Sequence, residues 1–334
     1  MRINKKIIFI VLIIVSFLII LFFFFSRKGI KKTPSSVVPT PKLTSNYKGK
    51  FPVNLLLKKE DLNLPQKLNL LEVSSTPLTE DYAKNVAQKL GFQGEPLSIN
   101  DVFDGKTFFW KNNNFSFFVF PQKGKVRYSQ NASSPTINKQ LSDQAIETLA
   151  TTFLNDGGVV DTNNLSLAKI RYLEEDKNGG IFKEAERSKA TVFEVSFNYK
   201  VAGYEILTPQ YIEPIIYAIL GQDGVVQSFQ FINIDNFKTD PKEYTLKSYQ
   251  EIVDNLQTAI LISLFGSQFA LSDLAQTAIQ KVDVNKIEIG YLYDPGKSTL
   301  LQPVYKLTGT AKVEGYEEEM SATLYLPALS SNQP

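Results

Sequence analysis

The sequence contains neither histidine nor cysteine. Without an imidazole, no Ser-His-Asp or Cys-His nucleophile can be assembled. Because both His and Cys are absent, zinc sites of the usual His and Cys type are excluded, as are haem and iron–sulfur ligation of the usual kind. Without Cys, no disulfide can form. Carboxylate chemistry, Ser-Lys chemistry and Mg²⁺ or Ca²⁺ on oxygen ligands remain open. No motif for them stands out, so we expect no catalytic residue, no metal site and no cofactor.

Acidic residues are absent from residues 1–50, which hold ten of the 36 Lys and Arg. Residues 51–334 therefore carry 26 basic and 34 acidic side chains, a net charge of −8, although the whole chain has a net charge of +2. An acidic body argues against a nucleic-acid partner, because nucleic-acid binding needs a basic surface. The basic segment would instead be attracted to anionic lipid headgroups.

One long apolar run without charge extends over 19 residues from Ile7 to Phe25. At about 1.5 Å per residue, a helix of this length nearly spans a hydrocarbon core of about 30 Å. We predict an uncleaved transmembrane helix at 7–25, after a short cytoplasmic tail at 1–6. A cleaved signal peptide is the rival interpretation. It is less favoured, because the run exceeds the usual length and Ser26-Arg27-Lys28 follows it in place of a small-x-small site.

Basic residues flank the run on both sides, so the positive-inside rule gives no clean orientation and, read literally, places the C-terminal side inside. We nevertheless predict an extracytoplasmic body, because a short basic head before an apolar run is typical of a signal anchor. Residues 26–50 are rich in Pro, Ser, Thr and Lys and are expected to form a flexible basic linker. The predicted juxtamembrane basic residues are Arg2, Lys5, Lys6, Arg27, Lys28, Lys31 and Lys32.

Three helices are predicted from capping residues and apolar stripes. The third begins with a capping box, in which the Ser248 hydroxyl and the Glu251 carboxylate each accept a backbone N–H of the other residue. The expected helices run from Thr79 to Leu90, from Ser142 to the glycines at 157–158, and from Ser248 to about Ile260.

Strands are predicted from period-2 alternation and from turn residues between apolar runs. The clearest is Thr191–Val201, whose alternation indicates one buried and one solvated face, as in an antiparallel sheet. The other expected strands are Lys106–Trp110, Phe115–Phe120, Val126–Tyr128, Leu167–Leu173, Ile215–Leu220, Val225–Ile234, Lys286–Tyr293, Gln302–Leu307 and Ser321–Leu326.

A helix followed by strands thus occurs three times, which predicts an α+β fold of helix-on-antiparallel-sheet modules behind the N-terminal transmembrane helix. We expect a small α+β domain at 51–134 and a larger one at 135–334. The larger domain would contain two helix-plus-sheet units, at 142–234 and 248–328.

The order of these elements resembles that of PepSY-like domains and of the YycH/YycI-type regulators of bacterial sensor kinases. The resemblance rests on Ile215–Val226, Ile287–Tyr293, Leu301–Leu307 and Leu324–Ala328, together with the position of the anchor. It implies a single membrane span, an extracytoplasmic body and a regulatory role, and it carries no catalytic residues to this chain.

We therefore expect a single-pass, membrane-anchored, extracytoplasmic protein of the cell envelope with a non-catalytic binding or regulatory function. Its partners would be the lipid bilayer and a membrane or envelope protein. Two alternatives remain open. One is a glycan hydrolase that uses two carboxylates about 5–10 Å apart. The other is a structural component of an envelope assembly, which would show an exposed sheet edge or apolar patch.

Overall fold

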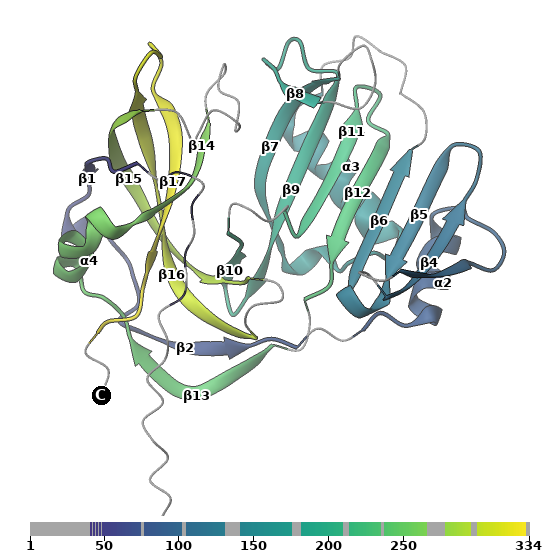
Figure 1. Cartoon of the computed structure of the whole chain (residues 1–334), viewed down its shortest axis with the longest axis horizontal. Coiled ribbons are helices and arrows are strands. Elements are labelled where there is room, and N and C mark those ends of the chain that lie inside the picture. The colour runs from purple at the N-terminus through teal and green to yellow at the C-terminus, as the bar shows by residue number, and fades with distance from the viewer. Residues whose placement is uncertain are drawn as a thin grey trace, which may run out of the picture. The chain divides into compact units, whose positions relative to one another are not determined.

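A computed structural model of the chain describes part of its sequence (Figure 1). The predicted transmembrane helix from Ile7 to Phe25 lies outside the described residues. Within them, no helix combines the length and the hydrophobicity that crossing a bilayer requires. The described residues are 41, 43, 45, 47, 49–74, 77–101, 105–130, 141–175, 182–209, 214–234, 237–265, 278–294 and 299–331.

The described residues form a mixed, sheet-rich α+β fold with few helices. In the largest run of paired strands, here called sheet 1, the order is β3-β4-β5-β6-β12-β11-β9-β7-β8, and every neighbouring pair is antiparallel. Its strands are β3 (Leu97–Asp101), β4 (Gly105–Lys111), β5 (Phe115–Phe120), β6 (Lys125–Gln130), β7 (Leu165–Glu175), β8 (Phe182–Glu184), β9 (Val192–Val201), β11 (Ile216–Gly221) and β12 (Val226–Ile232).

A second set of strands, sheet 2, has the antiparallel order β14-β17-β16-β15. Two short strands, β1 and β10, pair in parallel with β15, and β2 pairs with β13 and with the start of β16. The bounds are β1 (Val53–Leu55), β2 (Lys67–Glu72), β10 (Tyr204–Leu207), β13 (Lys238–Thr245), β14 (Ile260–Phe265), β15 (Ile279–Leu292), β16 (Leu300–Val313) and β17 (Met320–Pro327).

The three predicted helix starts are confirmed, because Thr79, Ser142 and Ser248 each cap a helix with the side-chain oxygen. The predicted end of the third helix is wrong. It stops at Asn255, and the residues from Ile260 onward form β14, where pairing with β17 overrides the helical stripe. The helices are α2 (Glu80–Lys89), α3 (Asp143–Asp156) and α4 (Tyr249–Asn255), with 3-10 turns η1 (Lys59–Asp61), η2 (Pro121–Lys123), η3 (Thr162–Asn164) and η4 (Leu256–Thr258).

Helix α3 packs on one face of sheet 1, behind β9, β11 and β12 in Figure 1. Ile146 and Leu154 of the helix are fully buried, as is Val195 of the sheet. Each such side chain contributes about 1.5–3 kcal/mol to the free energy of unfolding. The predicted alternation of β9 is thus confirmed on its buried side. Phe193, Val195, Phe197 and Tyr199 belong to the same buried hydrophobic cluster as the apolar residues of α3.

The opposite face of sheet 1 differs from the solvated face that the sequence predicts. Ser196 of β9 is only 6% exposed and Gln230 of β12 is fully buried, although both point away from α3. Neither amide atom of Gln230 has a hydrogen-bond partner among the described residues. At Ser196 and Gln230 this face is therefore buried, although Lys200 on the same face of β9 is exposed.

Strand pairing crosses the boundary that the sequence predicts between residues 134 and 135, because β6 pairs with β12 over five residue pairs. The strand β10 joins the two sheets, since it pairs with β9 on one side and with β15 on the other. A two-residue turn at Ala202-Gly203 connects β9 to β10, and both residues adopt positive φ. Where the chain divides into folding units stays a prediction.

Candidate functional site

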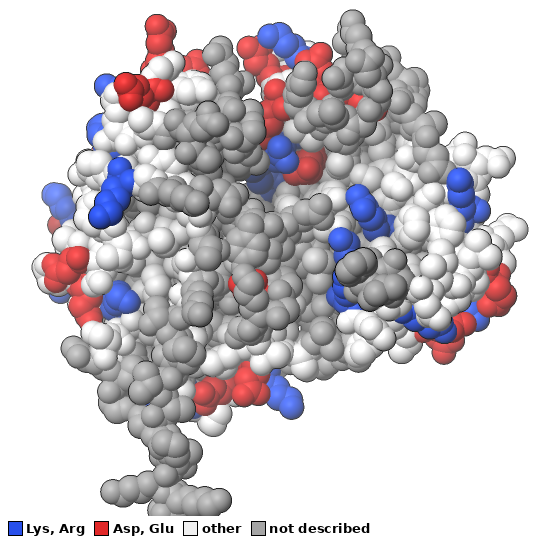
Figure 2. Space-filling view, in the orientation of Figure 1, with Lys and Arg blue, Asp and Glu red and all other residues white. Residues whose placement is uncertain are grey.

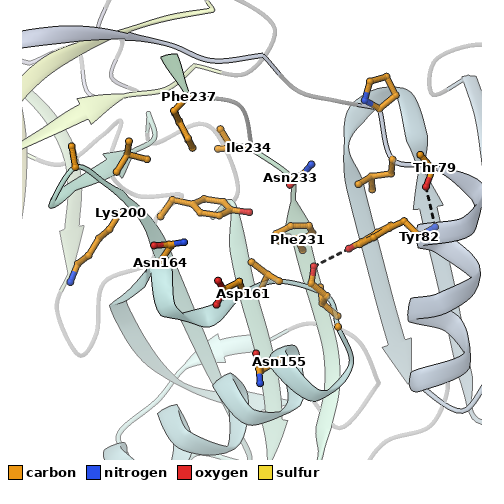
Figure 3. Close-up of a pocket in the computed structure, with 18 residues that line it drawn as sticks. Thr79, Tyr82, Asn155, Asp161, Asn164, Lys200, Phe231, Asn233, Ile234 and Phe237 are labelled. Carbon is orange, nitrogen blue, oxygen red and sulfur yellow. Dashed lines mark hydrogen bonds between the residues drawn. The ribbon is translucent and has the colours of Figure 1, made fainter. Parts of the chain in front are cut away.

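A cleft of about 880 Å³ lies where four segments that are distant in sequence converge (Figure 3). They are the start of α2, the loop from α3 to η3, the end of β9 with its turn, and the residues that follow β12. Its lining includes Pro77, Leu78, Thr79, Tyr82, Asn155, Gly158, Val159, Val160, Asp161, Asn164, Tyr199, Lys200, Val201, Ala202, Phe231, Asn233, Ile234 and Phe237. Clefts of this size are typical of ligand-binding sites.

The floor of the cleft is apolar and aromatic. Tyr199, Phe231 and Ile234 are 7%, 3% and 3% exposed, so their side chains are held by the core beneath. The rings of Tyr199 and Phe231 lie 6.4 Å apart at 53°, and the Tyr199 hydroxyl donates a hydrogen bond of 3.4 Å to the Ile232 carbonyl. The floor is therefore fixed by packing and offers hydrophobic surface to an occupant.

Tyr82 crosses one end of the cleft. It lies in the first turn of α2, and its hydroxyl donates a hydrogen bond of 2.9 Å to the Val159 carbonyl in the loop after α3 (Figure 3). Burial raises the pKa of the Tyr82 hydroxyl above its usual value, so that this donor keeps its proton. The Thr79 hydroxyl caps the same helix by accepting the Tyr82 backbone N–H, which fixes the base of the side chain.

The rim of the cleft is polar. Asn155 and Asn164 are exposed, and their side-chain amides form no hydrogen bond with any other described residue. Asp161 accepts the Asn163 backbone N–H at 3.0 Å as the cap of η3, and Lys200 lies exposed at the end of β9. An apolar floor with amides at the rim suits an occupant with a hydrophobic side chain and peptide groups, because side-chain amides both donate and accept hydrogen bonds.

The residues that line the cleft do not supply the two carboxylates that the hydrolase alternative requires. Asp161 is the one carboxylate among them, and Lys200 is the one amine. Within the described ranges, no three acidic side chains come close enough to hold a metal ion.

A cluster of charged side chains lies on the face of sheet 1 that points away from α3. Arg171 of β7 donates to Glu184 at 2.8 Å and to Glu194 at 3.0 Å, and Lys169 lies 3.9 Å from Glu184. Burial lowers the pKa of the Lys169 amine to about 8, and the charge of Arg171 lowers it as well, against the neighbouring carboxylates. Arg171 of β7 thus forms ion pairs with residues of both β8 and β9. The charged form of Lys169 is disfavoured by its burial beside Arg171.

A second polar group connects the two sheets through Glu205 of β10. Its carboxylate accepts hydrogen bonds from Ser166 of β7 at 2.9 Å and from Asn198 of β9 at 3.2 Å, and it lies 3.4 Å from the Lys306 ammonium of β16. Burial raises the pKa of the Glu205 carboxyl, but Lys306 and the two hydrogen bonds outweigh burial and lower it. Glu205 therefore stays ionised where the sheets meet.

The site residues that the sequence predicts all lie outside the described residues. This applies to the ends of the anchor, Ile7 and Phe25, and to the juxtamembrane residues Arg2, Lys5, Lys6, Arg27, Lys28, Lys31 and Lys32. The cleft was missed, because its lining comes from segments more than 150 positions apart in the sequence. The sequence predicted the helix cap at Thr79, the helix end at residues 157–158 and the strands Thr191–Val201 and Val225–Ile234, but none of these indicates a cavity.

Comparison with known proteins gives only distant structural likeness. No family model matches the chain. No curated protein matches its sequence. The crystal structure of an uncharacterised protein from Eubacterium rectale ATCC 33656 is similar, with a TM-score of 0.48, 13% identity and coverage of 80% of this chain and 86% of that one. The crystal structure of YycH from Bacillus subtilis is similar with a TM-score of 0.35, 13% identity and coverage of 73% and 52%. YycH is thus a distant structural neighbour of this chain, and membership of the PepSY family stays a prediction.

Proposed function

We propose that the chain is a membrane-anchored, extracytoplasmic protein of the cell envelope that binds a partner without catalysing a reaction and so regulates it. The single observation that carries the proposal is the cleft of about 880 Å³. The span at 7–25 would hold the chain in the membrane, and the basic linker would keep the body near the bilayer surface.

The cleft favours an extended polypeptide segment of the partner as its occupant. Tyr199, Phe231 and Ile234 offer a preformed apolar floor, which would take up a hydrophobic or aromatic side chain. The exposed side-chain amides of Asn155 and Asn164 would hydrogen-bond the peptide groups on either side of it. Because the floor is already packed, binding would require little reorganisation of the protein.

Site-specific photo-crosslinking in intact cells that produce the full chain tests the cleft. A benzophenone amino acid at position 164 lines the cleft, whereas the same group at position 163 is also exposed but does not. We expect a covalent adduct from position 164 only. Asn155→Trp fills the mouth and should abolish the adduct, while Asp156→Trp, at an exposed neighbour outside the lining, should preserve it. Equal adducts from both positions, or none, would overturn the proposed site.

The absence of cysteine makes the orientation directly measurable. Asn4→Cys places a thiol in the predicted cytoplasmic tail, and Lys200→Cys places one in the body. A membrane-impermeant maleimide added to intact cells should label the second variant and spare the first. The reverse pattern would place the body inside the cell and refute the extracytoplasmic part of the proposal.

A further inference from the structure

The turn between β9 and β10 holds an alanine in a backbone conformation that alanine rarely adopts. Ala202 has a φ of 51°, and among the described residues it is the one residue other than glycine with a positive φ. Gly203 follows with a φ of 85°, and Val201 pairs with Tyr204 across the turn. A type I′ turn requires two successive positive φ values, and its first position favours asparagine, aspartate or glycine. Alanine is strained there, because the left-handed conformation brings its Cβ close to the following carbonyl oxygen.

Packing within the protein does not compensate for this strain. Ala202 is exposed, and it belongs to none of the buried hydrophobic clusters that the described residues form. Strand β10 holds the turn in place instead, since it pairs with β9 on one side and with β15 on the other. A strained backbone that neighbouring strands hold in place is typical of positions that contact a ligand.

Ala202 lines the cleft of about 880 Å³, whereas Gly203 does not. No heavy atom of the described part of the chain lies within 4 Å of the place that a Cβ on Gly203 would take. In Figure 3, Lys200 of the same segment lies at the side of the cleft away from Tyr82. Of the two turn residues, the strained one therefore borders the cleft and the unstrained one faces open space.

Charge gives the cleft little power to select an occupant. Asp161 and Lys200 are the one carboxylate and the one amine of its lining, so their charges cancel. Figure 2 shows both signs of charge spread over the face of the molecule that it draws. Selection therefore depends on shape and on apolar contact. An asparagine at position 202 would fit the turn better than alanine, but it would place an amide that needs hydrogen-bond partners beside the occupant.

We infer that Ala202 is a specificity-determining residue of the cleft. Its methyl group contacts the apolar side chain of the occupant, and its small size leaves room for that side chain. The inference rests on the proposed function, because it assigns a role within the same cleft. It adds the class of side chain that the β9–β10 turn selects, which is aliphatic or aromatic and not polar.

The test observes the methyl groups of Ala202 and Ile234 by NMR in the full chain, embedded in nanodiscs of phosphatidylcholine. Ile234 also lines the cleft, and the variants Ala202→Gly and Ile234→Val identify the two signals. The probe is the blocked tripeptide acetyl-Gly-Phe-Gly-amide. Both signals should shift saturably with one dissociation constant. The peptide acetyl-Gly-Ser-Gly-amide should bind at least about tenfold more weakly, because serine buries far less apolar surface than phenylalanine.

Two asparagine variants separate the cleft from the turn. Measured from the Ile234 signal, Ala202→Asn should weaken binding of the phenylalanine probe at least about fivefold, because an amide replaces an apolar contact. Gly203→Asn places the same amide at the neighbouring position outside the cleft and should change the dissociation constant less than about twofold. Ala202→Asn should also lower the equilibrium constant of unfolding in urea about fivefold, because asparagine tolerates the left-handed conformation. Greater stability together with weaker binding cannot result from misfolding.

The possible failures of the inference and of the proposed function differ. A shift of the Ile234 signal without a shift of the Ala202 signal would overturn the inference and leave the proposed cleft intact. The same holds if Ala202→Asn binds the probe as well as the wild-type chain does, if both asparagine variants weaken binding equally, or if Ala202→Asn is less stable than the wild-type chain. If neither signal shifts up to about 20 mM probe, the proposed function of the cleft is refuted as well.

Discussion

The Tyr82 hydroxyl donates a hydrogen bond of 2.9 Å to the carbonyl oxygen of Val159, 77 positions later in the sequence. This bond connects the first turn of α2 to the loop after α3 at one end of the cleft. Among the residues that the structure describes, it is the one side-chain hydrogen bond between these two segments, and it holds them together at this end of the cleft.

Removing this bond should loosen the cleft. Tyr82→Phe leaves the buried Val159 carbonyl without its donor and should lower the free energy of unfolding by about 1 kcal/mol. Urea unfolding can be followed through the fluorescence of the lone tryptophan, Trp110, which is 4% exposed. Asp81→Asn, at the exposed neighbouring position of the same turn, is the control and should change stability by less than about 0.5 kcal/mol.

Because burial raises the pKa of Tyr82, we expect the free energy of unfolding to fall at alkaline pH. Its pKa is higher in the folded protein than in the unfolded chain, where it is near 10. Its contribution is therefore complete below pH 10 and declines as the pH rises above it, because the unfolded chain loses the proton first. The wild-type protein should lose more stability than Tyr82→Phe between pH 10 and pH 11. Parallel profiles would refute this assignment.

Lys169 should titrate well below the usual pKa of a lysine. Burial lowers its pKa to about 8, so between pH 8 and 10.5 the unfolded chain binds more protons than the folded protein. Stability should accordingly rise across that window. In the NMR spectrum of the protein with ¹³C-dimethylated lysines, the signal that Lys169→Gln removes should shift near pH 8. Glu184→Gln should move this midpoint lower, because the carboxylate favours the charged amine. A midpoint near 10 would contradict the prediction.

Glu205 should contribute a measurable coupling between the sheets. Glu205→Gln weakens the hydrogen bonds from Ser166 and Asn198 and the ion pair with Lys306, and should cost about 2 kcal/mol of stability. A double-mutant cycle with Lys306→Met isolates the contribution of the ion pair.

The pH profile gives an independent measurement. Because the pKa of Glu205 is lowered on folding, its contribution is present above the unfolded value of about 4.3 and is lost as the pH falls through the folded value. Glu205→Gln should therefore flatten the acid limb of the stability profile. An unchanged acid limb would show that the carboxylate is equally well solvated in both states.

The sequence predicted what local physics determines. The caps at Thr79, Ser142 and Ser248 depend on three or four neighbouring residues, and the strand at Val192–Val201 depends on alternation. Pairing between strands that are distant in the sequence could not be predicted from local patterns. The segment from Ile260 continues a helical stripe in the sequence, yet it forms β14 because β17 lies beside it. The parallel strands β1 and β10 are three and four residues long, too short to give a pattern of their own.

The cleft could not be predicted either, because it is also formed by segments distant in the sequence. The face of sheet 1 that points away from α3 shows a second limit of sequence patterns. Alternation marks which residues point away from α3, but it cannot say whether water or protein covers them. The sequence therefore predicted a solvated face at Glu194, Ser196, Asn198 and Lys200. Lys200 is indeed exposed, whereas Ser196 is buried there and Glu194 pairs with Arg171. The anchor and the juxtamembrane residues stay predictions from hydropathy and charge.

The burial of Gln230, on the face of sheet 1 that points away from α3, can be tested by substitution. Its side chain is fully buried, and neither amide atom has a hydrogen-bond partner among the described residues. Leaving such a group unpaired costs about 1–3 kcal/mol, so replacement by an apolar side chain of similar length should recover part of that cost. Gln230→Met should therefore raise the free energy of unfolding by about 1 kcal/mol in urea, with an unchanged dependence on denaturant. Gln93→Met, at an exposed position before β3, should leave it within about 0.5 kcal/mol. A loss of stability in Gln230→Met would contradict the prediction.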